Sequence, residues 1–125
     1  MNVLLVEPDK ILGEVAALAL QRSGHTVLTR SSAQTALDAL DERLPDVIVL
    51  EIQLGLHNGI ELLYEIRSYH EWHNIPVVIH TINSRVLDDQ FTPALAGLNV
   101  KSVLYKPRTK GSDLVRVVED VVSKA

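Results

Sequence analysis

Four polar side chains at the ends of apolar runs could together form one charged site. Glu7 and Glu51 end the first and third runs, Thr81 ends the fourth, and Lys106 follows the fifth. Ligands of an open parallel sheet bind beyond the carboxyl ends of its strands, near the point where the strand order reverses. We therefore expect two carboxylates, a hydroxyl and an ammonium to share one cleft. Lys106 would relieve the repulsion between the carboxylates, as a structural ion pair, a regulatory contact or both.

The elements that must position these residues are five apolar strands that alternate with helices. The strands are expected at residues 2–6, 25–29, 47–50, 76–81 and 102–105, and the helices at 9–23, 31–44, 60–69, 84–98 and 114–122. Strands that are apolar on both faces require helices on both sides of a parallel sheet. The fourth helix is expected to be short, kinked or late, because Pro93 removes an amide donor and disfavours helix at Thr92. The sequence therefore predicts a doubly wound α/β fold.

The composition fits one domain spanning residues 1–125. The chain is 46% apolar, which suffices for one core, and it contains no cysteine, which excludes a disulfide framework and a thiolate zinc site. A net charge of -4 disfavours binding to nucleic acid or to an anionic membrane. The chain has neither a signal peptide pattern nor an apolar run near the roughly 20 residues that span a bilayer. We expect a cytoplasmic protein.

The whole chain resembles the response-regulator receiver domain of two-component signalling, the CheY-like family. The family order and spacing are found in Leu4-Leu5-Val6-Glu7, Pro45-Asp46-Val47-Ile48-Val49-Leu50-Glu51, Asn58-Gly59-Ile60-Glu61-Leu62-Leu63, Ile75-Pro76-Val77-Val78 and Lys106-Pro107. The resemblance implies a flavodoxin-like sheet of five parallel strands in the order 2-1-3-4-5, with five helices. It implies a role in a signalling phosphorelay rather than an enzyme.

The resemblance also assigns family roles by position, and two of the five positions depart from the family pattern. Glu7 and Pro8 stand at the acidic pair that helps to hold Mg²⁺, Glu51 at the phospho-accepting aspartate, and Thr81 and Lys106 at the phosphate contacts. Pro8 has no side-chain oxygen for Mg²⁺. Glu51 is one methylene longer than aspartate, and a displacement of roughly 1 Å can cost about 100-fold in a positioned reaction. We therefore expect inefficient phosphoryl acceptance and no cofactor beyond weakly bound Mg²⁺.

The output surface also departs from the family pattern. Val103 occupies the position of the aromatic switch, and Tyr105, on the same side of the strand, substitutes for it only loosely. The last helix carries more valine than one buried stripe requires. The resemblance implies that the contact surface is the face formed by the fourth helix, fifth strand and fifth helix, and the extra valines agree with this. Its occupant would be a histidine kinase, an effector, a regulator or a second copy of the chain.

Three functions remain open from the sequence. The first is a pseudo-receiver that acts through protein contacts without phosphorylation. The second is a working phosphorylation switch in which Asp9 replaces the missing metal ligand and Glu51 accepts phosphate. The third is a flavodoxin-like nucleotide or flavin protein, although residues 7–10 lack the Gly/Ser/Thr-rich loop that cradles phosphate. The histidines do not define a metal site, but His57 or His80 could tune the charge of the cleft.

Overall fold

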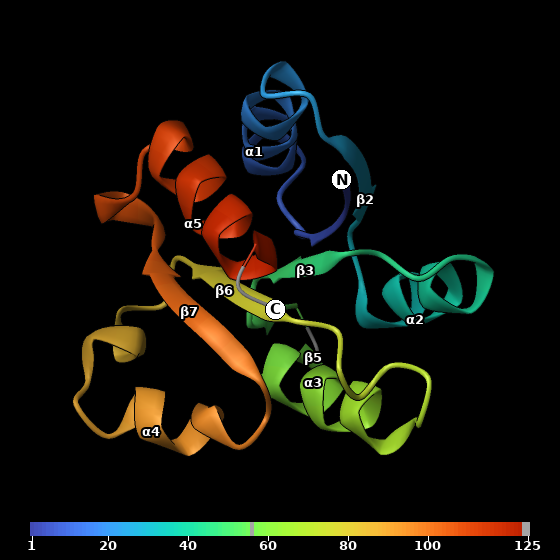
Figure 1. Ribbon diagram of the computed structural model, residues 1–125. Helices are drawn as coiled ribbons and strands as arrows, with labels where there is room; N and C mark the ends of the chain where they lie inside the picture. The colour runs from blue at the N-terminus through green and yellow to red at the C-terminus, as the bar shows by residue number, and fades with distance from the viewer. Residues whose placement is uncertain (56, 124–125) are drawn as a thin grey trace.

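The fold is a five-stranded parallel sheet between two layers of helices (Figure 1). The computed structural model describes residues 1–55 and 57–123. The strands of the sheet are β1 (Asn2–Val6), β2 (Thr26–Arg30), β3 (Val47–Leu50), β6 (Val77–Thr81) and β7 (Val100–Tyr105). They lie in the order β2-β1-β3-β6-β7. Counted by the strands of this sheet alone, that is the predicted 2-1-3-4-5 order, so the predicted doubly wound α/β fold is confirmed.

Helices cover both faces of the sheet because the strands are apolar on both sides. The helices are α1 (Lys10–Arg22), α2 (Ala33–Glu42), α3 (Gly59–Ser68), α4 (Phe91–Ala96) and α5 (Gly111–Ser123). Figure 1 shows α1 and α5 on one side of the sheet and α2 and α3 on the other. The sheet therefore divides the core into two clusters, and alternate residues of β1 belong to different ones. Val3 and Leu5 pack towards α1 and α5. Leu4 and Val6 pack towards α2 and α3.

The start of α3 packs closely against the segment that follows β3. Asn58 caps α3, its side chain accepting a hydrogen bond of 2.8 Å from the Ile60 amide. A Cβ at Gly59 would lie 2.6 Å from the Cα of Ile52 and 2.8 Å from the carbonyl oxygen of Glu51. Only glycine fits there, and its absence of a side chain lets α3 pack directly against the segment that carries Glu51.

The region between β6 and β7 is the least regular part of the fold. A 3₁₀ turn, η1 (Ser84–Leu87), comes first, and α4 starts at Phe91 and lasts six residues. Pro93 is the third residue of α4, where amides have no intrahelical acceptor, so its missing donor costs little. The prediction of a short, late fourth helix is therefore confirmed. A second 3₁₀ turn, η2 (Lys106–Arg108), follows β7.

Some boundaries and two short strands were not predicted. The strand β7 begins two residues earlier than expected and α5 three residues earlier. The segment expected to be a loop after Glu51 contains a small antiparallel pair, β4 (Gln53–Leu54) and β5 (His57–Asn58). Two-residue strands are too short to leave a periodic pattern in the sequence.

Candidate functional site

The ends of four strands bring the predicted charged residues into one buried cluster. Glu7, Glu51 and Thr81 are 4%, 2% and 0% exposed, and the side chain of Lys106 is 8% exposed. Burial of this kind makes an unpaired charge costly, so the contacts inside the cluster decide whether it is stable. We call these four residues the Glu51 cluster.

Lys106 joins the two carboxylates of the cluster. Its Nζ donates to Oε1 of Glu51 at 2.8 Å and also to Oε1 of Glu7. One ammonium thus compensates part of the charge of two buried carboxylates. The predicted contact between Lys106 and Glu51 is present, and Lys106 holds Glu7 in addition.

Both oxygens of Glu51 accept further hydrogen bonds. The Thr81 hydroxyl donates to Oε2, the Ile82 amide to Oε1 at 3.0 Å, and the Gln53 amide to Oε2 at 3.1 Å. Burial by itself would raise the pKa of Glu51, but the hydrogen bonds from Lys106, Thr81 and the two amides outweigh it and lower the pKa. Glu51 is therefore held as a carboxylate, with at least two donors on each oxygen.

The backbone amides of Gln53 and Ile82 could not be identified as site groups from the sequence. Every residue except proline carries an amide, so the residue type gives no signal. Their positions depend on the turns after β3 and β6. A hydrogen bond of 3.1 Å from the Asn83 amide to the Thr81 hydroxyl oxygen fixes the second of these turns.

Pro8 and Asp9 lie outside the buried cluster. Both are exposed, and the carboxylate of Asp9 caps α1, accepting a hydrogen bond of 2.9 Å from the Leu12 amide. The backbone amide of Asp9 donates to Oε2 of Glu7 at 3.2 Å. The backbone amide of Asp9 thus donates to the cluster, whereas its carboxylate caps the N-terminus of α1.

These donors and acceptors do not form a magnesium site. Mg²⁺ requires near-octahedral oxygen ligands. The carboxylates of Glu7 and Glu51 are engaged by Lys106, a hydroxyl and amides, and Pro8 offers no side-chain oxygen. Within residues 1–55 and 57–123, no three or more histidine and acidic side chains are grouped so as to hold a metal ion. The arrangement therefore does not fit the ion that the resemblance implies.

His80 lies beside the Glu51 cluster but faces a gap between α1 and the start of α5. This gap is lined by Leu12, Val15 and Leu114, among others. Burial lowers the pKa of His80 to about 4, with a further lowering by Lys106 and an opposing effect of Glu51. Its Nδ1 is buried and has no hydrogen-bond partner among the described residues. His80 is therefore neutral near pH 7, so it does not tune the cleft at that pH; the side chain of His57 lies outside the described part.

The expected output surface is more tightly packed than the sequence suggested. Val103 and Tyr105 lie on the same side of β7, as predicted, and pack against the core beneath α3 and α4. The valines expected to exceed the needs of one stripe are half-buried and pack on the core beneath α1, namely Val115, Val117, Val121 and Val122. The expected apolar surplus on α5 is thus absorbed by the core.

Several of the exposed apolar side chains lie on α1. Ile11, Val15 and Leu18 are 71%, 61% and 46% exposed, and the buried residues of this helix are Gly13, Ala16, Ala17 and Leu20. The buried face of the helix thus consists of three small residues and Leu20. The helix lies within the range expected from the sequence, 9–23, but Ile11, Val15 and Leu18, which recur at helical spacing, do not form its buried face.

Comparisons with known proteins agree with this geometry. The model of the response regulator receiver domain family matches residues 3–119. The chain is 32% identical over 107 residues to the transcriptional regulatory protein QseB of Haemophilus influenzae, covering 86% of this chain and 46% of QseB. It is 30% identical over 107 residues to CpxR of Escherichia coli (strain K12), covering 86% of this chain and 42% of CpxR. The chain thus spans less than half the length of these relatives.

Solved structures show the same fold. The chemotaxis protein CheY4 of Vibrio cholerae superposes with a TM-score of 0.85 at 19% identity, over 96% of this chain and 97% of CheY4. A sensor protein from Polaromonas sp. JS666 gives a TM-score of 0.88 at 20% identity, over 98% of this chain and 96% of the other.

The chain belongs to the response regulator receiver family of two-component signal transduction. This is a family of signalling domains and not of enzymes, which supports the receiver interpretation over the flavodoxin-like alternative. None of the helices in the described ranges is long and apolar enough to cross a membrane.

Proposed function

We propose that this domain is a pseudo-receiver, which signals through protein contacts and does not depend on phosphorylation. The observation that carries the proposal is the set of contacts around Glu51. Its carboxylate already engages Thr81 and Lys106, the two side chains at the family positions that contact phosphate. Glu51 thus partly imitates an acidic group that has been added to the site. The imitation is incomplete, because a phosphoryl group carries about -1.5 to -2 charges and three acceptor oxygens.

The same contacts oppose attack by Glu51 on a phosphoryl donor. A carboxylate oxygen must be free to approach phosphorus, yet each oxygen of Glu51 accepts at least two hydrogen bonds. Breaking such bonds in a buried site leaves donors unsatisfied, at about 1–3 kcal/mol each. The barrier to phosphorylation therefore has a local cause besides the lack of a fitting metal site.

The contact surface in this proposal is the face formed by α4, β7 and α5, and its partner is a kinase, effector or regulator protein in the cytoplasm. Ile82 and Leu87, on the segment that leads into α4, are 49% and 46% exposed. Ile82 also donates its amide to Glu51, so the cluster and this surface share a residue. The valines of α5 pack on the core and leave little apolar surface there for a homodimer. The exposed residues before α4 favour a partner that contacts the α4 side.

Phosphorylation in vitro tests the proposal. We expect no mass gain in the wild-type protein incubated with acetyl phosphate and Mg²⁺, measured by intact-mass spectrometry. The matched control is the double variant Pro8→Asp with Glu51→Asp, which restores the family pattern and should gain one phosphoryl mass. A Mg²⁺-dependent gain in the wild type that disappears in Glu51→Gln would overturn the proposal.

A further inference from the structure

The outer edge of β2 is open, because β2 is the first strand of the sheet and pairs only with β1. We propose that a second copy of this chain pairs with this edge, β2 against β2 in antiparallel orientation, so that two five-stranded sheets become one. The inference concerns the sheet edge opposite β7 and is independent of the proposed function.

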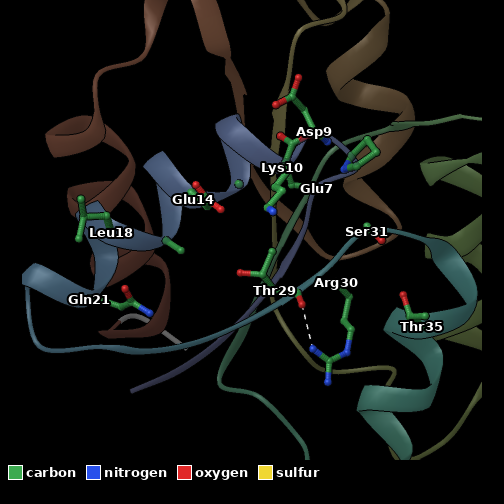
Figure 2. Close-up of a pocket in the computed structure, with 13 residues that line it drawn as sticks. Glu7, Asp9, Lys10, Glu14, Leu18, Gln21, Thr29, Arg30, Ser31 and Thr35 are labelled. Carbon is green, nitrogen blue, oxygen red and sulfur yellow. Dashed lines mark hydrogen bonds between the residues drawn. The ribbon is translucent and has the colours of Figure 1, made fainter.

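The hydrogen bonds of β2 identify which backbone groups face outward. The Thr26 amide donates to the Met1 carbonyl at 2.9 Å, and the Arg30 carbonyl accepts from the Glu7 amide at 2.9 Å. Successive residues of a strand direct their backbone groups to opposite sides, so the groups of Val27 and Thr29 face the open side. The Thr29 carbonyl accepts one bond of 2.8 Å from the Arg30 side chain, drawn in Figure 2. It keeps a second lone pair for another donor.

The sequence of β2 is self-complementary about Leu28. In an antiparallel pair centred on a two-fold axis at Leu28, Val27 of each copy lies opposite Thr29 of the other, and each such pair exchanges two backbone hydrogen bonds. Leu28 meets its own counterpart, and Arg30 lies opposite Thr26. Arg30 is the charged residue of the strand, and this register does not place it against another cation. The pairing therefore joins compatible side chains at every position.

Hollows on both faces of β2 leave room for a second sheet. On the α1 side, a cavity of about 790 Å³ lies between β2 and the helix (Figure 2). Gly13 and Ala17 of α1 and Thr29 of β2 are among the residues that line it. On the α2 side, a cavity of about 200 Å³ is lined by Leu28 and Leu44. Each hollow is lined in part by β2, by Thr29 on the α1 side and by Leu28 on the α2 side.

Exposed apolar side chains surround this edge. Leu18, Leu28 and Leu44 are 46%, 40% and 52% exposed and line the two hollows. Covering apolar surface is favourable by about 25 cal/mol per Å². Proteins commonly block an open edge with charged residues, lysine above all, or with proline, and the charged residue of β2 is Arg30 at its end. The opposite edge strand, β7, carries the exposed Lys101. The cation of β7 is thus its second residue and that of β2 its last, which leaves residues 26–29 of β2 uncharged.

A disulfide cross-link tests the geometry, because the natural chain contains no cysteine. In the proposed pair, position 28 of the two copies forms a non-hydrogen-bonded pair with Cα atoms about 4.5 Å apart, a separation that a disulfide spans. Leu28→Cys should form a covalent dimer under mild oxidation. Tyr64→Cys, on the exposed face of α3, is the matched control and should stay monomeric. Failure of Leu28→Cys to cross-link faster than this control would overturn the proposal.

Sedimentation measures the association without a cross-link. Wild-type protein should shift from monomer to dimer as its concentration rises from micromolar to millimolar. Leu28→Lys should stay monomeric, because the pairing would place the lysines of the two copies opposite each other. Circular dichroism checks that this variant is folded; if it is not, the cysteine pair decides. A wild-type protein that stays monomeric throughout, or a dimer that survives in folded Leu28→Lys, would contradict pairing through β2.

Discussion

The polar groups at the carboxyl end of the sheet have partners within the chain, whereas backbone groups at the outer edge of β2 face outward. At the carboxyl end, the oxygens of Glu51 and the ammonium of Lys106 are buried and bonded to each other. At the edge, the backbone groups of Val27 and Thr29 face outward beside exposed leucines. The first region is saturated from within the chain, whereas the second can still form bonds. The two proposals above rest on this difference: phosphorylation is not expected at the saturated region, and a second chain is expected to pair at the open edge.

Removing the ammonium of Lys106 from the Glu51 cluster should lower the free energy of unfolding more than any other change considered below. Lys106→Met leaves Glu7 and Glu51 buried side by side without their common partner, and breaking a buried ion pair in this way costs about 3–5 kcal/mol. Urea unfolding at pH 7 would show the loss. Lys101→Met, which alters an exposed lysine of β7, is the control and should change little. A loss for Lys106→Met no larger than the control's would mean that the cluster is not held by this charge.

Acid should weaken the fold through His80, which lies next to the cluster. The folded pKa of about 4 is below the ordinary value of 6.5, so the unfolded chain binds the proton first. Stability is therefore fully present above pH 6.5 and is lost as the pH falls towards 4, by about 3 kcal/mol. His80→Phe should flatten the dependence of unfolding free energy on pH in this window, and His70→Phe, at an exposed histidine, should not. An unchanged slope in His80→Phe would exclude a buried neutral histidine.

Neutralising Glu51 should have a smaller effect that depends on pH. Glu51→Gln keeps the shape but weakens the bonds from Lys106 and Thr81, and we expect a loss of about 1–3 kcal/mol at pH 7. Because the pKa of Glu51 is lowered from 4.5, the wild-type advantage is present above pH 4.5 and disappears as the pH falls through the folded pKa. Thermal unfolding at several pH values would measure it. A higher melting temperature for Glu51→Gln at pH 7 would show that repulsion from Glu7 dominates instead.

The sequence predicted the sheet and the convergence of Glu7, Glu51, Thr81 and Lys106 for one physical reason. Strands buried on both faces are continuous apolar runs, and parallel strands end at the same edge of a sheet. The orientation of α1 was not predictable from spacing alone, because the helix buries Leu20 together with small residues such as Gly13 and leaves Ile11, Val15 and Leu18 exposed. The amides of Gln53 and Ile82 were also beyond sequence analysis, because turn geometry and not residue type places them.

Amide chemical shifts of Gln53 and Ile82 test most directly whether the Glu51 cluster is saturated. Both amides donate to Glu51, so a phosphoryl mimic bound there must disturb them. On titration with Mg²⁺ and beryllofluoride, we predict that their NMR signals stay in place in the wild-type protein. They should move in the double variant Pro8→Asp with Glu51→Asp, which shows that the mimic is active. Saturable, Mg²⁺-dependent shifts of these two amides in the wild type would contradict a receiver domain that acts without phosphorylation.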